Sequence, residues 1–207
     1  MEVTGNKLLM ASRRSFARPP GKRKYKKLFV LSMEGKITER QYFDLFKASN
    51  AIIHLEILPG SLKSSPFHVL KRMKSYLIQN RLMKIDEAWL VIDKDQWTEE
   101  QLASLYDWSK TSENYGLALS NPNFEFWLLL HFEDGAGISG SLSCVRRLKR
   151  FLPDFDKSID KIRFNKDCIK NAISRAKEKD RPATEDWPRT TGTTVYRLVE
   201  KILENEK

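Results

Sequence analysis

Cysteine and histidine are scarce in this chain of 207 residues. The two cysteines, Cys144 and Cys168, are too few for a disulfide framework or for a cysteine-based zinc site. The three histidines lie too far apart in the sequence to form a local metal-binding motif: His54, His68 and His131. With no disulfide framework, the reducing cytoplasm is the expected compartment.

Long apolar runs are absent as well. The longest apolar stretch, residues 124–132, contains Glu125 and His131 and is far shorter than the ~18 residues that a membrane-spanning helix needs. The basic N-terminus has no apolar signal core, so neither a membrane partner nor secretion is expected. The phosphate-binding pattern G-x-x-x-x-G-K-[ST] is missing too, so the chain is not expected to hydrolyse ATP itself.

The net charge of +10 is concentrated at one end of the chain. Residues 1–27 contain nine Lys or Arg and one acid, so they carry +8, and the remaining 180 residues are nearly neutral. Such a segment attracts nucleic acid through counterion release, although a solvated tail has the same composition. We therefore predict a basic N-terminal arm over residues 1–27 and nucleic acid as a partner.

Short apolar strands alternate with amphipathic helices along residues 28–133. Strands are expected at 28–33, 52–58, 88–92 and 117–119, and helices at 38–46, 66–83 and 98–110, with a further helix opening at Asn121-Pro122. Thr38 and Gln41 have the spacing of a capping box at the start of the first helix. This alternation predicts an α/β fold with a mostly parallel four-stranded sheet flanked by helices.

Residues 134–207 are expected to form a helical C-terminal part packed on this core, with helices near 141–151, 164–178 and 192–204. The segment 135–140 satisfies the dinucleotide-binding pattern G-x-G-x-x-G. That pattern binds a pyrophosphate only between a strand and a helix, and the segment before it is helical. We therefore predict a loop and no dinucleotide site.

Acidic side chains follow three of the four predicted strands. Glu34 and Glu39 follow the first, Asp93 and Asp95 the third, and Glu125 the fourth. The carboxyl ends of parallel strands meet at one edge of a sheet, where α/β proteins bind ligands. Clustered carboxylates repel one another, and a hard divalent cation removes that repulsion. Each acid alone could be an ordinary strand-end charge or helix cap, so the prediction of a metal site rests on the whole set.

Local patterns support this site. Gly35 is expected to permit a tight turn directly after the first strand. Asp93 and Asp95 would project from the same side of an extended segment and could share an ion. Glu125 lies in a helix that is apolar on nearly every face, so its carboxylate needs either a metal ion or a basic partner.

Two other side chains near these acids could have either a structural or a functional role. Trp97 follows the Asp-x-Asp turn and could stack on a nucleic acid base, although burial is the commoner fate of tryptophan. His131 lies on the same predicted helix as Glu125. We expect it to be a core histidine rather than a catalytic one.

Taken together, these segments resemble the RloB-like family, which has the Toprim fold shared by topoisomerases, primases and OLD-type nucleases. The resemblance covers residues 26–204. It rests on the segments EGKITERQYF at 34–43, IDKD at 92–95, SNPNFEFWLLLHF at 120–132 and TTVYRLV at 193–199. It implies a Toprim-like core over residues 28–133.

The resemblance also implies an activity. It implies that this chain, like the members of that family, is a metal-dependent nuclease of phage defence, often encoded beside an AAA-type ATPase. We therefore expect an endonuclease that hydrolyses phosphodiester bonds of DNA or RNA during abortive infection. The acids that would bind a pair of Mg²⁺ or Mn²⁺ ions, and act in catalysis, are Glu34, Glu39, Asp93, Asp95 and Glu125.

OLD-type nucleases also use a lysine that follows the acids in sequence. Lys157 is our candidate, and Lys149, Lys161 and Lys166 lie nearby as alternatives. A second class of function stays open, namely a non-catalytic subunit that binds nucleic acid or regulates an ATPase in a defence complex. Binding of a divalent metal discriminates between the two classes.

Overall fold

Five strands form a single sheet in the computed structural model, which describes residues 26–49, 52–60, 65–95 and 97–205. The predicted basic arm lies almost entirely outside the described residues. The strand order is β2-β1-β3-β4-β5, and the first four strands are parallel while β5 runs antiparallel to β4. The strands are β1 (Lys27–Met33), β2 (Ile53–Ile57), β3 (Glu87–Asp93), β4 (Tyr115–Asn121) and β5 (Gly192–Thr193).

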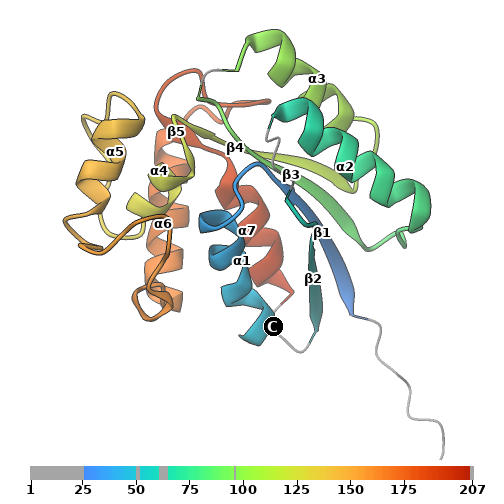
Figure 1. Cartoon of the computed structure of the whole chain (residues 1–207), viewed down its shortest axis with the longest axis horizontal. Coiled ribbons are helices and arrows are strands. Elements are labelled where there is room, and N and C mark those ends of the chain that lie inside the picture. The colour runs from blue at the N-terminus through green and yellow to red at the C-terminus, as the bar shows by residue number, and fades with distance from the viewer. Residues whose placement is uncertain (1–25, 50–51, 61–64, 96, 206–207) are drawn as a thin grey trace, which may run out of the picture.

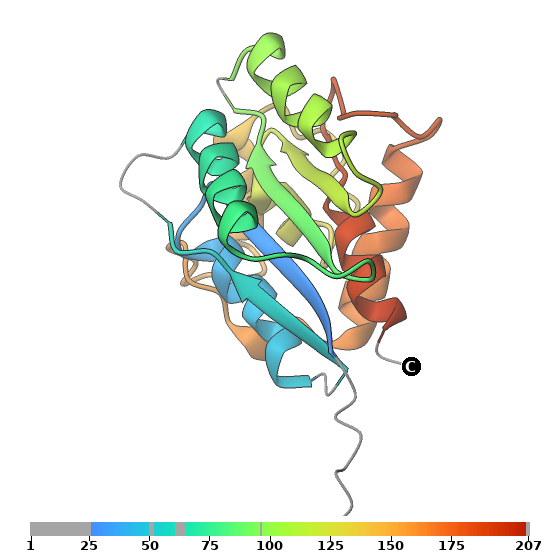
Figure 2. The same cartoon turned by 90° about the vertical axis from the view of Figure 1, so that its right-hand side faces the viewer.

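Helices cover both faces of this sheet. The helices are α1 (Thr38–Ser49), α2 (Pro66–Gln79), α3 (Glu99–Ser109), α4 (Phe124–Leu129), α5 (Ser141–Leu148), α6 (Lys166–Lys179) and α7 (Val195–Glu204), with a short 3-10 helix η1 (Lys161–Arg163). Helices α2 and α3 lie on one face, and α1 and α7 lie on the other (Figures 1 and 2). In the described part of the chain, no helix is both long and apolar enough to cross a membrane.

Alternation along the strands divides the core into two clusters. Phe29 and Leu31 of β1 are buried against α1 and the C-terminal helices, whereas Val30 between them packs with α2 and α3. Successive side chains of a strand point to opposite faces, so a strand that is apolar at every position must be covered on both sides. The run of apolar residues in each central strand therefore specifies this three-layer arrangement.

The sheet has a topological switch point between β1 and β3. The chain leaves β1 through α1 to reach β2 on one side, and then returns through α2 on the opposite face to form β3 on the other side. Ligands of open α/β sheets bind outside the carboxyl ends of the strands at such a point. The residues that follow β1 and β3 are therefore the first place to look for a site.

The predicted elements agree with the observed ones except near β4 and β5. The prediction of four strands was wrong, because β5 is a two-residue strand that we had included in a helix starting at 192. Asn121 ends β4 and does not open the next helix; α4 begins at Phe124, after Asn123. The glycine-rich segment 135–140 is a loop between α4 and α5, as expected.

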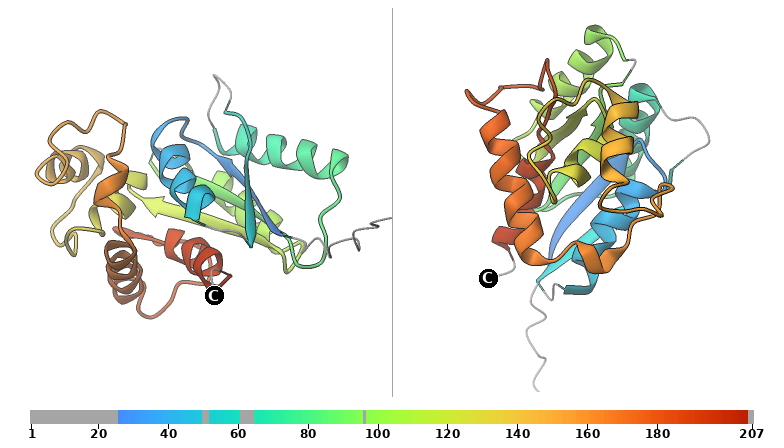
Figure 3. Two further views of the ribbon diagram at one scale, coloured as in Figure 1. Left: turned by 90° about the horizontal axis from the view of Figure 1, so that it is seen from below. Right: turned by 90° about the vertical axis from the view of Figure 1, so that its left-hand side faces the viewer.

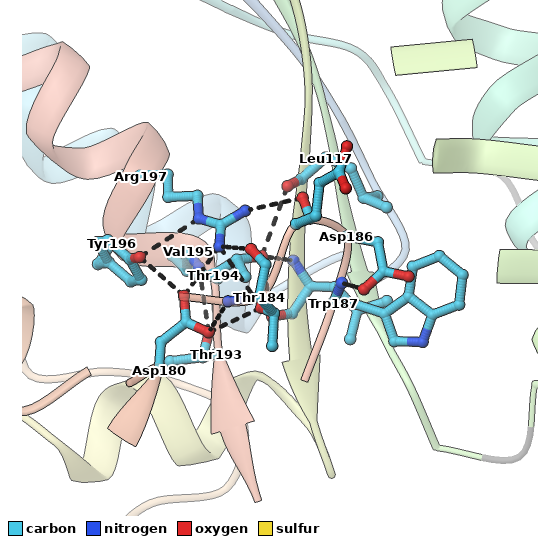
Figure 4. Close-up of polar contacts among 12 residues, drawn as sticks. Leu117, Asp180, Thr184, Asp186, Trp187, Thr193, Thr194, Val195, Tyr196 and Arg197 are labelled. Carbon is cyan, nitrogen blue, oxygen red and sulfur yellow. Dashed lines mark hydrogen bonds and ion pairs between the residues drawn. The ribbon is translucent and has the colours of Figure 1, made fainter. Parts of the chain in front are cut away.

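A buried polar network holds the segment between α6 and α7 in place (Figure 4). The carboxylate of Asp180 accepts hydrogen bonds from the Thr184 hydroxyl at 2.7 Å, the Tyr196 hydroxyl at 2.8 Å and the Arg197 guanidinium at 2.8 Å. Because a buried carboxylate needs partners of this kind, the network fixes the path of the chain into β5.

Residues 193–199, one of the segments that carry the family resemblance, therefore have a structural role. The Leu119 amide donates to the Thr194 hydroxyl at 2.9 Å, and the hydroxyls of Ser120 and Thr193 lie 2.9 Å apart. Ser120 is the register partner of Asp93. The C-terminal segment thus supports the sheet edge at which Asp93 lies.

Candidate acidic site

Five of the six predicted site residues line one pocket at the carboxyl edge of the sheet. The pocket has a volume of about 280 Å³. Its charged lining consists of Lys36 and the predicted residues Glu34, Glu39, Asp93, Glu125 and Lys157. Topology alone had suggested that the acids meet, and the structure brings four of them together.

Each carboxylate is positioned by the end of an element. Glu34 follows β1, and its amide donates to the Val91 carbonyl of β3 at 3.0 Å, so the turn is tied to the neighbouring strand. Asp93 is the last residue of β3. Glu39 and Glu125 lie in the first turns of α1 and α4, where the helix dipole favours a negative charge.

Asp95 does not line the pocket. It is exposed, and its φ of 30° takes the chain out of the extended conformation directly after β3. Our expectation that Asp93 and Asp95 project from the same side of an extended segment was therefore wrong. The negative charge of Asp95 still contributes to raising the pKa of Glu34, which places it at the rim of the site.

Gly35 makes room for a side chain of the site. It does not adopt a positive φ. A Cβ atom at this position would lie only 1.8 to 2.1 Å from the carboxylate atoms of Glu39. The missing side chain thus leaves the space into which Glu39 points, and the Gly35 backbone hydrogen bond helps to stabilise the ionised form of that carboxyl group.

Two residues that sequence reasoning did not assign to the site hold the turn after β1. The indole N–H of Trp97 donates to both carboxylate oxygens of Glu34, at 3.1 and 3.2 Å. Arg72 of α2 donates to the Met33 carbonyl at 2.6 Å. The sequence suggests only base stacking or burial for Trp97. A sequence pattern that could have pointed to Arg72 is a basic residue on a helix face that is otherwise buried.

Burial and mutual repulsion raise the pKa values of the two most enclosed acids. The pKa of Glu39 rises from 4.5 to about 7, first because the side chain is buried and then because Glu125 and Glu34 carry like charges. Burial also raises the pKa of Asp93 well above its ordinary value, and the charges of Glu39, Glu125 and Glu34 add to the effect. The pocket thus holds more negative charge than its own groups can stabilise.

The two half-buried acids show the same direction of shift. Burial raises the pKa of Glu34, and the hydrogen bond from Trp97 opposes part of that rise. Burial likewise raises the pKa of Glu125, and the positive charge of Lys157 acts in the opposite direction. The sequence predicts either a metal ion or a basic partner for Glu125. The charge of Lys157 acts on Glu125, but it offsets only part of the effect of burial.

Lys157 reaches the pocket from the segment between α5 and α6. It has a φ of 63°, in the left-handed region that L-residues rarely adopt. The alternatives Lys149, Lys161 and Lys166 do not line the pocket. His131 is buried away from the acids: its Nε2 lies 3.2 Å from the Tyr42 hydroxyl, and burial lowers its pKa to about 3, which confirms it as a core residue.

The donor chemistry of this pocket fits a hard divalent cation. Carboxylate oxygens are the ligands that Mg²⁺ and Mn²⁺ prefer, and four carboxylates in one pocket that lysines compensate only in part are the setting in which a cation relieves repulsion. Among the described residues, however, no three His, Cys, Asp or Glu side chains are grouped closely enough to hold a metal ion as they stand. Binding would therefore require the carboxylates to turn toward a shared point.

Comparison with known proteins places this α/β chain with an acidic pocket in a family. The model of the family described as RloB-like protein matches residues 29–202. The chain therefore belongs to the RloB-like family. Searches of curated proteins and of solved structures gave no match.

Proposed function

We propose that this protein is a divalent-metal-dependent endonuclease with a Toprim-like core, related to OLD-type nucleases, that hydrolyses phosphodiester bonds of DNA or RNA. The observation that carries the proposal is the gathering of four carboxylates and two lysines, Lys36 and Lys157, in a single pocket at the switch point of the sheet. This combination suits metal-assisted phosphodiester cleavage, because acids hold the cations and a lysine offsets charge on the phosphate.

Glu34, Glu39, Asp93 and Glu125 are the residues that would hold a pair of Mg²⁺ or Mn²⁺ ions, with Asp95 near the rim. Bound ions of this kind activate a water molecule and stabilise the leaving oxygen. Asp93 ends β3 among these acids, and the charges of Glu39, Glu125 and Glu34 add to the burial that raises its pKa, so we expect it to be one of the metal ligands. The hydrogen bonds from the Trp97 indole would keep the Glu34 carboxylate oriented toward the metal.

Lys157 would act on the substrate rather than on the acids alone. Its side chain is exposed and lines the pocket, so its ammonium group can contact a non-bridging phosphate oxygen. Charge that builds up on that oxygen in the transition state would be stabilised by this contact. Lys36 lines the same pocket and offers a second cation at its exposed side.

An exposed basic cluster at the C-terminal end of α5 supports nucleic acid as the substrate. It consists of Arg146 in the helix and of Lys149 and Arg150 directly after it, and none of these has an ion-pair partner among the residues that the structure describes. Helix α5 packs against α4, whose first turn carries the pocket residue Glu125. A phosphate backbone that enters the pocket would therefore meet these cations.

The biological setting we propose is the cytoplasm, in abortive-infection defence against phage, with an AAA-type ATPase as partner. Membership of the RloB-like family supports this setting through the resemblance described above. The chain has no phosphate-binding pattern for ATP of its own, so ATP hydrolysis would be supplied by the partner.

Cleavage of plasmid DNA and of tRNA, with Mg²⁺, Mn²⁺ or EDTA, tests the proposal. We expect cleavage of at least one substrate that depends on the metal and is lost in Asp93→Asn. Asp107→Asn on the exposed surface of α3 is the matched control and should cleave like the wild type. Nucleic acid binding without cleavage under any of these conditions, with the ATPase partner added, would instead indicate a non-catalytic subunit.

A further inference from the structure

Two side chains in the first turn of α1 contact a segment more than a hundred residues away. The Thr38 hydroxyl donates to the carbonyl of Lys157 at 2.9 Å. The side-chain oxygen of Gln41 accepts from the Ile159 amide at 2.8 Å and from the Ser158 hydroxyl at 3.3 Å. These are the two residues whose spacing predicted a capping box, and that prediction was wrong because both are used for tertiary contacts.

The same helical turn also carries an acid of the pocket. Thr38, Glu39 and Gln41 follow one another closely at the start of α1, and Glu39 points into the pocket that Lys157 lines. In the right-hand view of Figure 3 the orange segment between α5 and α6 lies beside blue α1. One turn of helix thus presents a carboxylate to the pocket and two hydrogen-bonding groups to the segment that carries the lysine.

The conformation of Lys157 needs such support. Its left-handed φ of 63° is disfavoured for a residue with a side chain, and such conformations persist only where the surroundings hold them. Buried Ile159 keeps the segment on the core, but an apolar contact does not define how the backbone turns beside it. The hydrogen bonds to the Lys157 carbonyl, the Ser158 hydroxyl and the Ile159 amide hold the chain directly after the strained φ of Lys157 and so define that turn.

We infer that Gln41, together with Thr38, is a positioning residue that holds segment 157–159 against α1 and so places the Lys157 ammonium group beside the acids of the pocket. The inference rests on the proposed nuclease function, in which Lys157 contacts the substrate phosphate. Gln41 itself does not line the pocket. Its effect on cleavage would therefore pass through Lys157.

Four variants of the full-length protein test this inference: Gln41→Leu, Gln41→Glu, Lys157→Ala and the double variant Gln41→Leu/Lys157→Ala. Gln41→Leu keeps the size of the side chain and removes the acceptor, whereas Gln41→Glu keeps an oxygen acceptor. Gln79→Leu makes the same chemical change at an exposed position of α2 and serves as the matched control.

The first readout is steady-state cleavage of the substrate that the wild type cleaves in Mn²⁺. We expect Gln41→Leu to lower kcat at least about tenfold with little change in KM, because a small misplacement of a catalytic group is costly. Gln41→Glu should recover most of that loss. The double variant should be no slower than Lys157→Ala, since no positioned lysine remains to be displaced.

The second readout does not depend on activity. The Ile159 amide should exchange its hydrogen slowly in the wild type and in Gln41→Glu, and at least about tenfold faster in Gln41→Leu. Exchange at Ala172, in the buried face of α6, should be the same in all variants. This comparison separates release of the segment from general destabilisation.

Distinct results overturn the inference and the proposed function. A wild type that cleaves while Gln41→Leu cleaves equally fast would overturn the positioning role and leave the nuclease intact. The inference would also be overturned if Gln41→Leu lowered kcat by the same factor in the wild type and in the Lys157→Ala background. Gln41 would then affect cleavage by a route that does not involve Lys157. A wild type that cleaves no substrate with any metal contradicts the proposed function and the role of Lys157 with it.

Discussion

At the scale of single residues, Asp93 shows the repulsion within the acidic pocket most clearly. It is the acid whose pKa is raised by the charges of three others, after the larger effect of burial. Natural proteins retain repelling carboxylates of this kind where function requires them, at a cost in folding stability. Removing the charge should therefore affect stability and activity in opposite directions.

Asp93→Asn should raise the free energy of unfolding of the metal-free protein at pH 8 by about 1 kcal/mol, because one of several like charges is removed from a buried site. Urea denaturation with EDTA present measures this change. Asp107→Asn, on an exposed helix surface, should leave the free energy unchanged. A clear loss of stability in Asp93→Asn would mean that this carboxylate is a structural group.

Gly35→Ala should impair the site while leaving the fold in place. The added Cβ would displace the Glu39 carboxylate, which is the flexible end of a side chain and can swing away, so the cost in stability should be only about 1 kcal/mol. Affinity for Mn²⁺ should fall, as isothermal calorimetry can measure. Gly140→Ala, where nothing lies within 4 Å of the new atom, is the control.

The shifted pKa of Glu39 predicts how stability depends on pH. In the folded protein its pKa is about 7, against 4.5 in the unfolded chain, so the folded state binds more protons between these values. Stability without metal should therefore fall as pH rises from about 4.5 to about 7, by about 2 to 3 kcal/mol for this group. Unfolding in EDTA at several pH values measures the slope.

Glu39→Gln should flatten that pH dependence, and saturating Mn²⁺ should reverse it, because a cation binds the ionised carboxylate. If the free energy of unfolding of the metal-free wild type rose between pH 5 and pH 7, the assignment of Glu39 as a buried acid with a raised pKa would be contradicted.

At the scale of elements, the sequence predicts those strands and helices that local patterns define. The four parallel strands and the helices between them follow from apolar runs and helical spacing, and each was found within a few residues of its place. Strand β5 has only two residues, so it has no periodicity to detect. Its position depends on contacts with β4 that are remote in sequence.

The start of α1 shows the limit of local patterns more clearly. The spacing of Thr38 and Gln41 is that of a capping box, and a capping box is what local sequence favours. Tertiary contacts to segment 157–159 take both side chains instead. Thr98 and Gln101 have the same spacing and do form a capping box at α3.

The basic cluster at the C-terminal end of α5 should govern affinity for nucleic acid. Changing Arg146, Lys149 and Arg150 to alanine should weaken binding and lower the slope of log K against log salt by about 2 to 3 for duplex DNA, since each cation lost removes about one phosphate contact. Fluorescence anisotropy across a salt series, in EDTA to prevent cleavage, measures the slope.

A matched control for α5 lies on the opposite face of the sheet. The exposed residues Lys71, Lys74 and Arg81 carry the same charge, and their triple alanine variant should change the slope by less than half as much. If both triple variants lowered the slope of log K against log salt equally, net charge alone, and not the basic cluster at the end of α5, would determine binding.

At the scale of the whole molecule, topology accounts for where the site lies. The switch point between β1 and β3 brings the turn after β1 next to the end of β3, and α1 and α4 add their first turns. The gathering of Glu34, Glu39, Asp93 and Glu125 could therefore be predicted from the order of elements. The exclusion of Asp95 could not, because it depends on the backbone angles of one residue.

The residues that support the site were also beyond prediction from the sequence. Trp97, Arg72 and Gln41 each act through a contact between elements, and no local spacing encodes such a contact. Sequence reasoning thus found the charged groups of the site, whereas the structure adds the groups that hold them in place.

Calorimetric titration of Mn²⁺ into the wild type and into Glu34→Gln/Asp93→Asn, at pH 8, is the most direct test of the central claim that the acidic pocket binds a divalent metal. We expect saturable binding in the wild type that is lost in the double variant, while both proteins unfold cooperatively. Absence of binding in the wild type, or equal binding in both proteins, would contradict the assignment of this pocket as a metal site.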